Sequence, residues 1–155
     1  MPTITALVHT ENDARRLGRC LETLYACDEI LIVDHNSSDD TIRIARQYGA
    51  RIVSAAAPHA LPVRTQWVLS LASRESITEG LAASLYECKS GSVPMKGNET
   101  FSFLLREENA AGWIEGTTAQ TRLVPAGWNH WHQRLPINQE SSHLLQGDIL
   151  RFTFP

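Results

Sequence analysis

The stretch Glu29-Ile30-Leu31-Ile32-Val33-Asp34-His35-Asn36-Ser37-Ser38-Asp39-Asp40-Thr41 decides the fold. Residues 30–33 form a short apolar run, mostly β-branched, which is typical of a strand buried on both faces of a parallel sheet. The run ends at Asp34, and a small polar loop then leads into a helical pattern. In open α/β sheets, ligands bind beyond the carboxyl ends of the strands. The stretch therefore predicts a ligand crevice next to Asp34.

The segments on either side predict two more strands in the same sheet. Residues 3–9 and 51–54 are rich in β-branched residues, and a helical pattern separates each from the central strand. The first helix is expected after a cap at Asn12 or Asp13 and extends to Leu24. The second is expected over 40–48, with Ser38 or Asp39 as its cap and Gly49 at its end. This β-α-β-α-β order predicts parallel strands joined by right-handed crossovers.

The middle of the chain predicts a loop and two further helices. Residues 55–62 contain two prolines and are expected to form a loop. Val63, Trp67 and Leu71 recur at a spacing of four and indicate a helix from residue 63. Ser76 and Glu79 match a capping box for a second helix, whose apolar stripe is formed by Ile77, Leu81, Leu85 and Cys88.

The second half of the chain is predicted to be rich in β-structure. Turn residues become frequent after Lys89, and residues 100–105, 118–124 and 149–154 resemble strands. Too few residues remain there for an independent core. We therefore expect one α/β domain over 1–155, with a Rossmann-like nucleotide-binding half (1–89) and a β-rich half (90–155) on the acceptor side.

Composition excludes several classes of protein. The 155 residues are 43% hydrophobic and 20% charged, with a net charge of −3. This mixed charge offers no footprint for nucleic acid, and no apolar run reaches the ~20 residues of a membrane span. Residues 1–4 lack the layout of a secretory signal, and the three cysteines lack metal-ligand spacing. These features favour a cytoplasmic protein and leave its oligomeric state open.

Four fragments in order resemble the family-2 glycosyltransferases, which have the GT-A fold. They are the strand end at 8–12, the helix face Arg19-Cys20-Leu21-Glu22-Thr23-Leu24, the strand and loop at 28–41, and the helix end at 44–50. Residues 65–72 also resemble a helix of the family, and Arg122-Leu123-Val124 and residues 135–140 faintly resemble its downstream segments. The resemblance implies transfer of a sugar from a nucleotide-diphosphate donor to an unknown acceptor, with inversion, as in the synthesis of bacterial cell-envelope polysaccharides.

One departure from the family concerns its metal. The family's fourth strand ends in Asp-x-Asp, which holds the Mg²⁺ or Mn²⁺ that bridges the diphosphate, and this chain contains no Asp-x-Asp. Ala72-Ser73-Arg74-Glu75 leads directly into residues 76–79, so we expect the strand and the metal motif to be missing together. A divalent metal is thus implied by the resemblance, while its motif is not found.

The resemblance also implies a set of nucleotide-binding residues. Asp34 would accept the imide N–H of a uracil, although a carboxylate here can equally cap a helix or loop. Thr10 and Glu11 would line the same crevice or cap the first helix, and Asn36 and Ser37 lie in the adjoining loop. Asp39 and Asp40 are expected to be helix caps and not metal ligands.

Without a metal, the diphosphate needs arginines or a helix N-terminus. Arg64 is the candidate that best matches the family, and Arg74 and Arg122 are others. A general base for the acceptor hydroxyl is expected at Glu140, although an exposed glutamate would fit the same position. His130 and His132 would share one side of an extended segment, but neither a helical His pair nor a nearby carboxylate completes a zinc site. Trp128 and Trp131 are candidates for stacking on a sugar.

Two functions therefore remain from the sequence. The first is a glycosyltransferase, and the alternative is a non-catalytic GT-A-like domain that binds a nucleotide or a partner and has lost the metal site. A nucleotidyltransferase is a weaker third hypothesis. Such a protein would have a Gly-rich basic loop after the first strand, and this sequence has none there.

Overall fold

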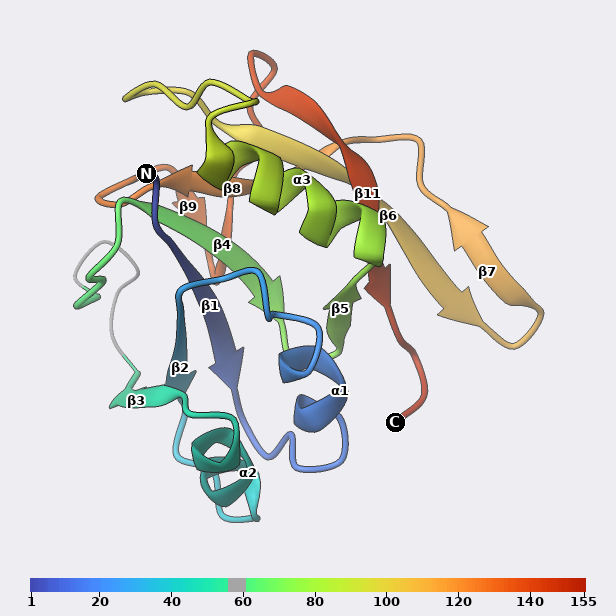
Figure 1. Ribbon diagram of the computed structural model, residues 1–155. Coiled ribbons are helices and arrows are strands. Elements are labelled where there is room, and N and C mark those ends of the chain that lie inside the picture. The colour runs from blue at the N-terminus through green and yellow to red at the C-terminus, as the bar shows by residue number, and fades with distance from the viewer. Residues whose placement is uncertain (56–60) are drawn as a thin grey trace.

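A nine-stranded mixed sheet runs through the computed structural model, which describes residues 1–55 and 61–155 (Figure 1). Its strand order is β3-β2-β1-β4-β8-β6-β11-β5, with β7 paired to β6, and β9 and β10 form a separate small ladder. The strands are β1 Ile4–Thr10, β2 Glu29–Asp34, β3 Arg51–Ser54, β4 Trp67–Ala72, β5 Glu75–Ile77, β6 Phe101–Asn109, β7 Gly112–Glu115, β8 Gln120–Pro125, β9 Trp131–His132, β10 Leu135–Pro136 and β11 His143–Arg151. The helices are α1 Leu17–Leu21, α2 Thr41–Gln47 and α3 Glu79–Ser90.

The four strands β3, β2, β1 and β4 are parallel, as expected for the first three. Thr10 pairs with Asp34 and His9 pairs with Ala72, so the carboxyl ends of these strands meet at one edge of the sheet. The chain builds from β1 outward to β3 and then returns to place β4 on the other side of β1. This reversal of strand order between β1 and β4 is a topological switch point, where α/β sheets bind ligands.

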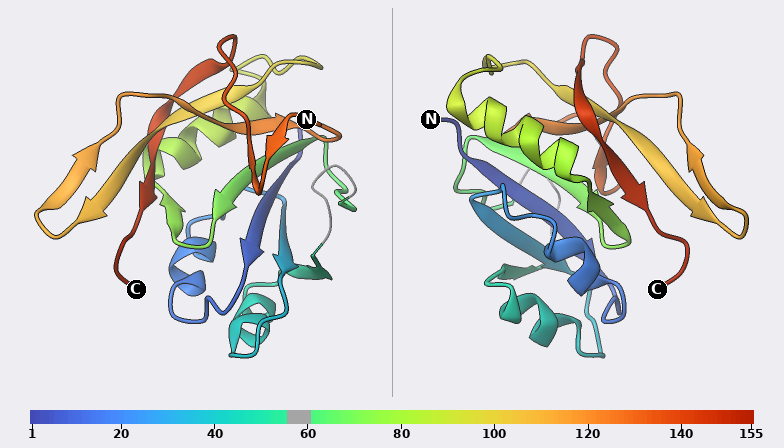
Figure 2. Two further views of the ribbon diagram at one scale, coloured as in Figure 1. Left: turned by 180° about the vertical axis from the view of Figure 1, so that it is seen from behind. Right: turned by 45° about the vertical axis from the view of Figure 1, so that its right-hand side comes forward.

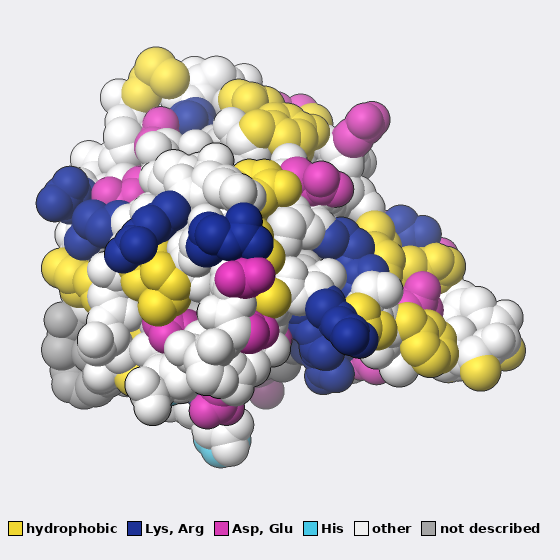
Figure 3. Space-filling model, turned by 90° about the horizontal axis from the view of Figure 1, so that it is seen from below, with side chains coloured by type: hydrophobic (Ala, Val, Ile, Leu, Met, Phe, Trp, Pro, Cys, Tyr) yellow, Lys and Arg dark blue, Asp and Glu magenta, His cyan; other side chains and the backbone are white. Residues whose placement is uncertain are grey.

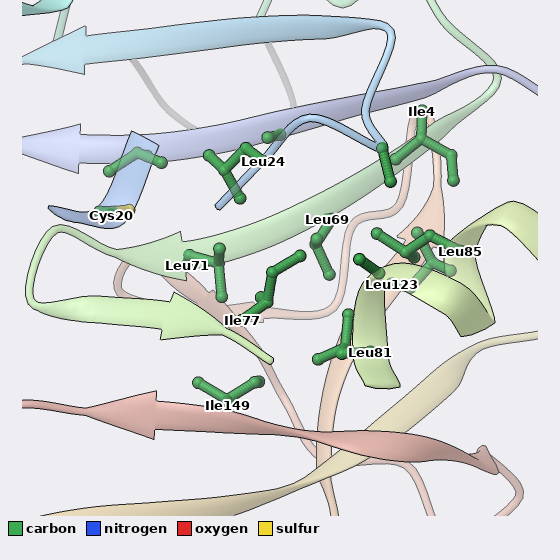
Figure 4. Packing of buried hydrophobic residues seen from close by; sticks show 14 of the residues in the cluster. Ile4, Cys20, Leu24, Leu69, Leu71, Ile77, Leu81, Leu85, Leu123 and Ile149 are labelled. Atoms are coloured by element: carbon green, nitrogen blue, oxygen red, sulfur yellow. The ribbon is translucent and has the colours of Figure 1, made fainter. Parts of the chain in front are cut away.

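The two faces of the sheet are covered by different elements (Figure 2). Helices α1 and α3 pack on one face, where Leu69, Leu81, Leu85 and Leu123 are fully buried (Figure 4). Each buried leucine contributes about 1.5–3 kcal/mol through the hydrophobic effect. On the other face, Leu7, Leu31, Val33, Val68 and Val124 pack with the half-buried Trp128 and Trp131.

The predicted helix from Val63 to Leu71 is wrong, because residues 67–72 form strand β4. β4 lies between β1 and β8, and its apolar side chains are buried. The fourth strand of the parallel sheet is therefore present, contrary to the expectation that it is missing with the metal motif. Of the predicted loop at 55–62, residues 56–60 lie outside the described part of the chain.

The helix boundaries differ from those predicted in two places. The first helix is a single turn, because residues 11–16 form turns held by hydrogen bonds to the entrance of α2, among them Asp13 N–H to Thr41 Oγ1. At α3 the cap is Thr78, whose hydroxyl accepts from Leu81 N–H at 3.2 Å. Ser76 lies in β5 and donates to the Arg19 carbonyl instead. Helix α2 and its end at Gly49, with φ +73°, agree with the prediction.

The C-terminal half adds strands to the same sheet. β6 and β8 overlap the predicted strands, while β11 begins at His143, six residues earlier than expected. A bulge near Gly147 interrupts the alternation of inward and outward side chains within β11. The first part of the strand therefore does not show the strand pattern in the sequence. Within the described residues, no helix is long and apolar enough to cross a membrane.

Candidate functional site

Asp34 lies at the end of β2 with both carboxylate oxygens in local hydrogen bonds. Oδ1 accepts from Thr10 Oγ1 at 2.9 Å and from Ser37 Oγ at 2.6 Å, and Oδ2 accepts from Ser37 N–H at 2.9 Å. These bonds tie the ends of β1 and β2 to the loop that enters α2. Oδ2 has only one of these donors, so a carboxylate lone pair remains there for a ligand.

The charge of Asp34 is stabilised by these donors. Burial raises the pKa of its carboxyl, but the hydrogen bonds from Ser37 and Thr10 outweigh burial and hold the pKa below its usual value. Asp34 is therefore ionised at neutral pH and can accept a hydrogen bond from a ligand N–H or hydroxyl.

A cavity of about 670 Å³ opens beside Asp34, between the ends of β2 and β3. His35, Asn36 and Ser37 line it on one side, and Ile52 and Val53 contribute an apolar wall. Asn36 has φ +61°, in the left-handed region, which turns the loop sharply after the strand. Of the predicted residues, the structure thus brings together Asp34, Asn36 and Ser37 here, with Thr10 bonded behind them.

Glu11 is exposed and does not line this cavity. The Glu11 N–H donates to the Asp13 carboxylate, so this residue belongs to the turn that precedes α1. Asp39 accepts from the N–H and hydroxyl of Thr41, as expected for a cap at the start of α2. The side chain of Asp40 makes no capping hydrogen bond, contrary to the prediction, and forms an exposed ion pair with Arg43.

A second cavity, of about 600 Å³, lies at the switch point between β1 and β4. His9, Ala72 and Ser73 line its floor, and the β9–β10 hairpin provides the other wall with His132 and Arg134. His9 Nδ1 lies 2.8 Å from His35 Nε2, so the two imidazoles connect this cavity to the one beside Asp34. Neither His9 nor Arg134 was predicted as a site residue, although His9 is the polar end of the first predicted strand.

The imidazole pair is held neutral. Burial is the main cause that lowers the pKa of His9 to about 4, and His35 and Arg134 add to the effect. The pKa of His35 is lowered chiefly by burial and then by Arg134. Arg134 therefore acts electrostatically on both histidines, and it supplies a permanent positive charge to the lining of the switch-point cavity.

The end of β4 carries Ala72-Ser73-Arg74-Glu75 where the family has its metal-binding acids. Glu75 is fully buried and accepts from Arg122 at 2.7 and 3.0 Å, from Arg151 at 3.0 Å and from Ala72 N–H at 2.8 Å. Its oxygens are thus committed to the core, and Ala72 offers only a methyl group. The described residues contain no cluster of three or more His, Cys, Asp or Glu suited to a metal ion, so these residues do not fit a bound Mg²⁺ or Mn²⁺.

The other predicted site residues lie elsewhere. Arg64 precedes β4 and lines a cavity with Asp28 and Glu29, at the amino ends of the strands and so at the edge opposite Asp34. Arg122 is buried in its ion pair with Glu75, and Arg74 is exposed just after β4. Glu140 is exposed in the turn before β11 and lines neither cavity at the strand ends.

The edge at which the strands end carries many positive side chains. Figure 3 views the molecule from below, the side to which β1, β2 and β4 point in Figure 1, and shows Lys and Arg gathered in two groups. Helices α1 and α2 contribute Arg19 and Arg46, whereas Arg43 of α2 is paired with Asp40. Exposed acids such as Glu11 lie at the same edge, so its charge is mixed.

Comparison with known proteins agrees with the fold. No model of a known protein family matches the chain. An uncharacterized glycosyltransferase of Rickettsia felis is 39% identical over 54 residues, which cover 34% of this chain and 19% of that protein. One from Rickettsia prowazekii is 33% identical over 54 residues, covering 34% of this chain and 18% of that protein. The crystal structure of Staphylococcus aureus TarS 1–349 in complex with UDP superposes with a TM-score of 0.50 at 18% identity, over 71% of this chain and 37% of TarS 1–349.

Over 54 residues the chain is therefore similar in sequence to glycosyltransferases, and its fold is GT-A-like. The GT-A-like sheet confirms the α/β fold predicted from the sequence. The chain spans about a fifth of the length of the curated relatives that it matches, 19% and 18% in the two cases above.

Proposed function

We propose that this chain binds a nucleotide-diphosphate sugar at the carboxyl ends of β1 to β4 and acts as a family-2 glycosyltransferase. One observation carries the proposal: Thr10, Asp34 and Ser37 form a closed hydrogen-bonded set at the strand ends, and an open cavity adjoins it. The free lone pair of Asp34 Oδ2 suits a uracil imide N–H or a ribose hydroxyl. Ile52 and Val53 give an apolar wall against which a base can pack.

The donor that we propose is a UDP-sugar. TarS 1–349, which shares the fold, has been crystallised with UDP and with UDP-GlcNAc. In this chain the base would lie in the cavity beside Asp34 and the diphosphate would point toward the switch point. The acceptor and inversion at the sugar are further parts of the proposal, with Glu140 as the candidate general base.

A thermal unfolding series tests the nucleotide site. UDP, UDP-GlcNAc, GDP and ADP are added to the full chain, and a ligand at ~100 times its dissociation constant should raise the free energy of unfolding by about 2.7 kcal/mol. We expect this shift with UDP and UDP-GlcNAc and not with ADP. Asp34→Asn should abolish the shift, whereas Asp40→Asn, which removes an exposed acid at the start of α2, should leave it unchanged. A full UDP shift in Asp34→Asn would contradict the placement of the base.

The second candidate, a binding domain without activity, is favoured by one observation. Neither Asp nor Glu lines the cavity at the switch point, so the reacting centre lacks a nearby carboxylate base among the described residues. Release of UDP from UDP-GlcNAc separates the two functions. Release that Glu140→Gln abolishes while UDP binding persists would support transfer, and no release despite tight binding would support the binding domain.

A further inference from the structure

The cavity at the switch point differs in charge from a metal-bridged diphosphate site. Two arginines and two histidines line it, and the described residues contribute no acid to its wall. One arginine, Arg122, is neutralised by Glu75, which lies behind the wall. Arg134 is the remaining permanent charge of the lining, and within the described residues it has no ion-pair partner.

A buried polar atom in the same wall also lacks a partner. His9 is only 6% exposed, and its Nε2 has no hydrogen-bond partner among the described residues. A buried polar atom left unpaired costs free energy, so such an atom in a cavity wall indicates a missing ligand or water. When His35 Nε2–H donates to His9 Nδ1, His9 carries its proton on Nε2 and can donate it to an oxygen of a ligand.

These observations select the class of ligand. Divalent cations in proteins are bound chiefly through carboxylates, and the described wall has none, whereas it offers a guanidinium and neutral donors. An Arg fork and neutral N–H or hydroxyl donors are the groups that bind phosphate oxygens. Ser73, which follows β4 directly, adds a hydroxyl to the floor of the cavity.

We infer that this cavity binds the diphosphate of the nucleotide-sugar donor without a divalent metal, with Arg134 in place of the metal charge and His9 and Ser73 as further donors. The inference rests on the proposed function. The diphosphate can reach this cavity only if the base of the nucleotide binds in the pocket beside Asp34. The contact between His9 and His35 joins the two cavities, so one extended ligand can occupy both.

Calorimetric titration of the full chain tests the inference with UDP, uridine and pyrophosphate, each in EDTA and in Mn²⁺. The dissociation constant of UDP should agree within about twofold in the two buffers. Arg134→Ala should weaken UDP by about 10- to 100-fold, the range expected for a charge-assisted hydrogen bond, and should leave uridine unchanged. Arg134→Lys should recover part of the loss. Lys96→Ala, which removes an exposed lysine ahead of β6 that lines neither cavity, should change none of the affinities.

The outcomes distinguish this inference from the proposed function. UDP binding that requires Mn²⁺, or that is unaffected in Arg134→Ala, would overturn the inference while the nucleotide site stands. Failure of UDP, uridine and pyrophosphate alike to bind would overturn both.

Discussion

His9 Nδ1 and His35 Nε2 lie 2.8 Å apart at the ends of β1 and β2, and both imidazoles are held neutral. Protonation of both rings would place two positive charges in contact, with the charge of Arg134 acting on both. The contact therefore makes the carboxyl edge of the sheet sensitive to pH.

We expect stability to fall as the pH drops from about 6.5 to about 4. An unfolded histidine binds its proton near pH 6.5, whereas burial, His35 and Arg134 lower the pKa of folded His9 to about 4. Between these values the unfolded chain binds more protons, so acid favours unfolding, by up to about 3 kcal/mol for this group. Above pH 6.5 the group is neutral in both states and contributes no slope.

Urea unfolding at several pH values measures this slope. His9→Asn should flatten it between pH 6.5 and 4.5, whereas His130→Asn, at an exposed site, should keep it. An unchanged slope in His9→Asn would assign the acid sensitivity to other groups. Asp34 cannot cause it, because its lowered pKa takes effect only below its ordinary value near 3.8.

The parallel half of the fold was predictable because its signals are local. The run at 30–33 and its flanking helices fix β1, β2, α2 and β3 without long-range information. β4 was missed for a physical reason: a spacing of four residues fits a helix of period 3.6 and equally a strand of period 2. Trp67 and Leu71 do share one face, but it is the face of a buried strand.

The site was predictable only where it is built from neighbouring residues. Asp34, Asn36 and Ser37 belong to one loop, and their meeting follows from the sequence. Arg64 was placed through the wrong helix, and a strand of six residues, about 20 Å long at ~3.3 Å per residue, separates it from the expected edge. Arg134 shares a cavity with His9 only because the β9–β10 hairpin, distant in sequence, folds over the strand ends, and no local pattern reveals this.

The buried ion pair between Glu75 and Arg122 makes a prediction about the core. Arg122 is 1% exposed, and its loss would leave the Glu75 carboxylate buried with only part of its compensation. Arg122→Met should therefore destabilise the protein by about 3–5 kcal/mol in urea unfolding. The matched control is Arg43→Met, which breaks an exposed pair and should cost less than about 1 kcal/mol. Equal losses in the two variants would contradict this account.

Gly147 makes a prediction about the bulge in β11. It has φ +101°, and a Cβ atom there would overlap the backbone of Leu81 in the first turn of α3. Because backbone strain and overlap add, Gly147→Ala should lower the free energy of unfolding by about 3 kcal/mol or more. Gly97→Ala has no atom within 4 Å of the new Cβ and should change it by less than about 0.5 kcal/mol. A stable Gly147→Ala variant would mean that α3 can move away from β11.

Two acidic substitutions at the end of β4 should make UDP binding sensitive to Mn²⁺. The double variant Ala72→Asp, Arg74→Asp places two carboxylates at the strand end and removes one positive charge, which creates the oxygen ligands that a divalent cation prefers. We expect Mn²⁺ to tighten UDP binding at least about fivefold in the double variant and to leave the unsubstituted chain unchanged, as measured by calorimetric titration. The control Ala72→Asn, Arg74→Asn has side chains of the same size as the two introduced aspartates but without their charge, so it should not respond to Mn²⁺. A response in that control would show that the metal binds the nucleotide alone, and no response in the Asp variant would show that the strand end does not face the diphosphate.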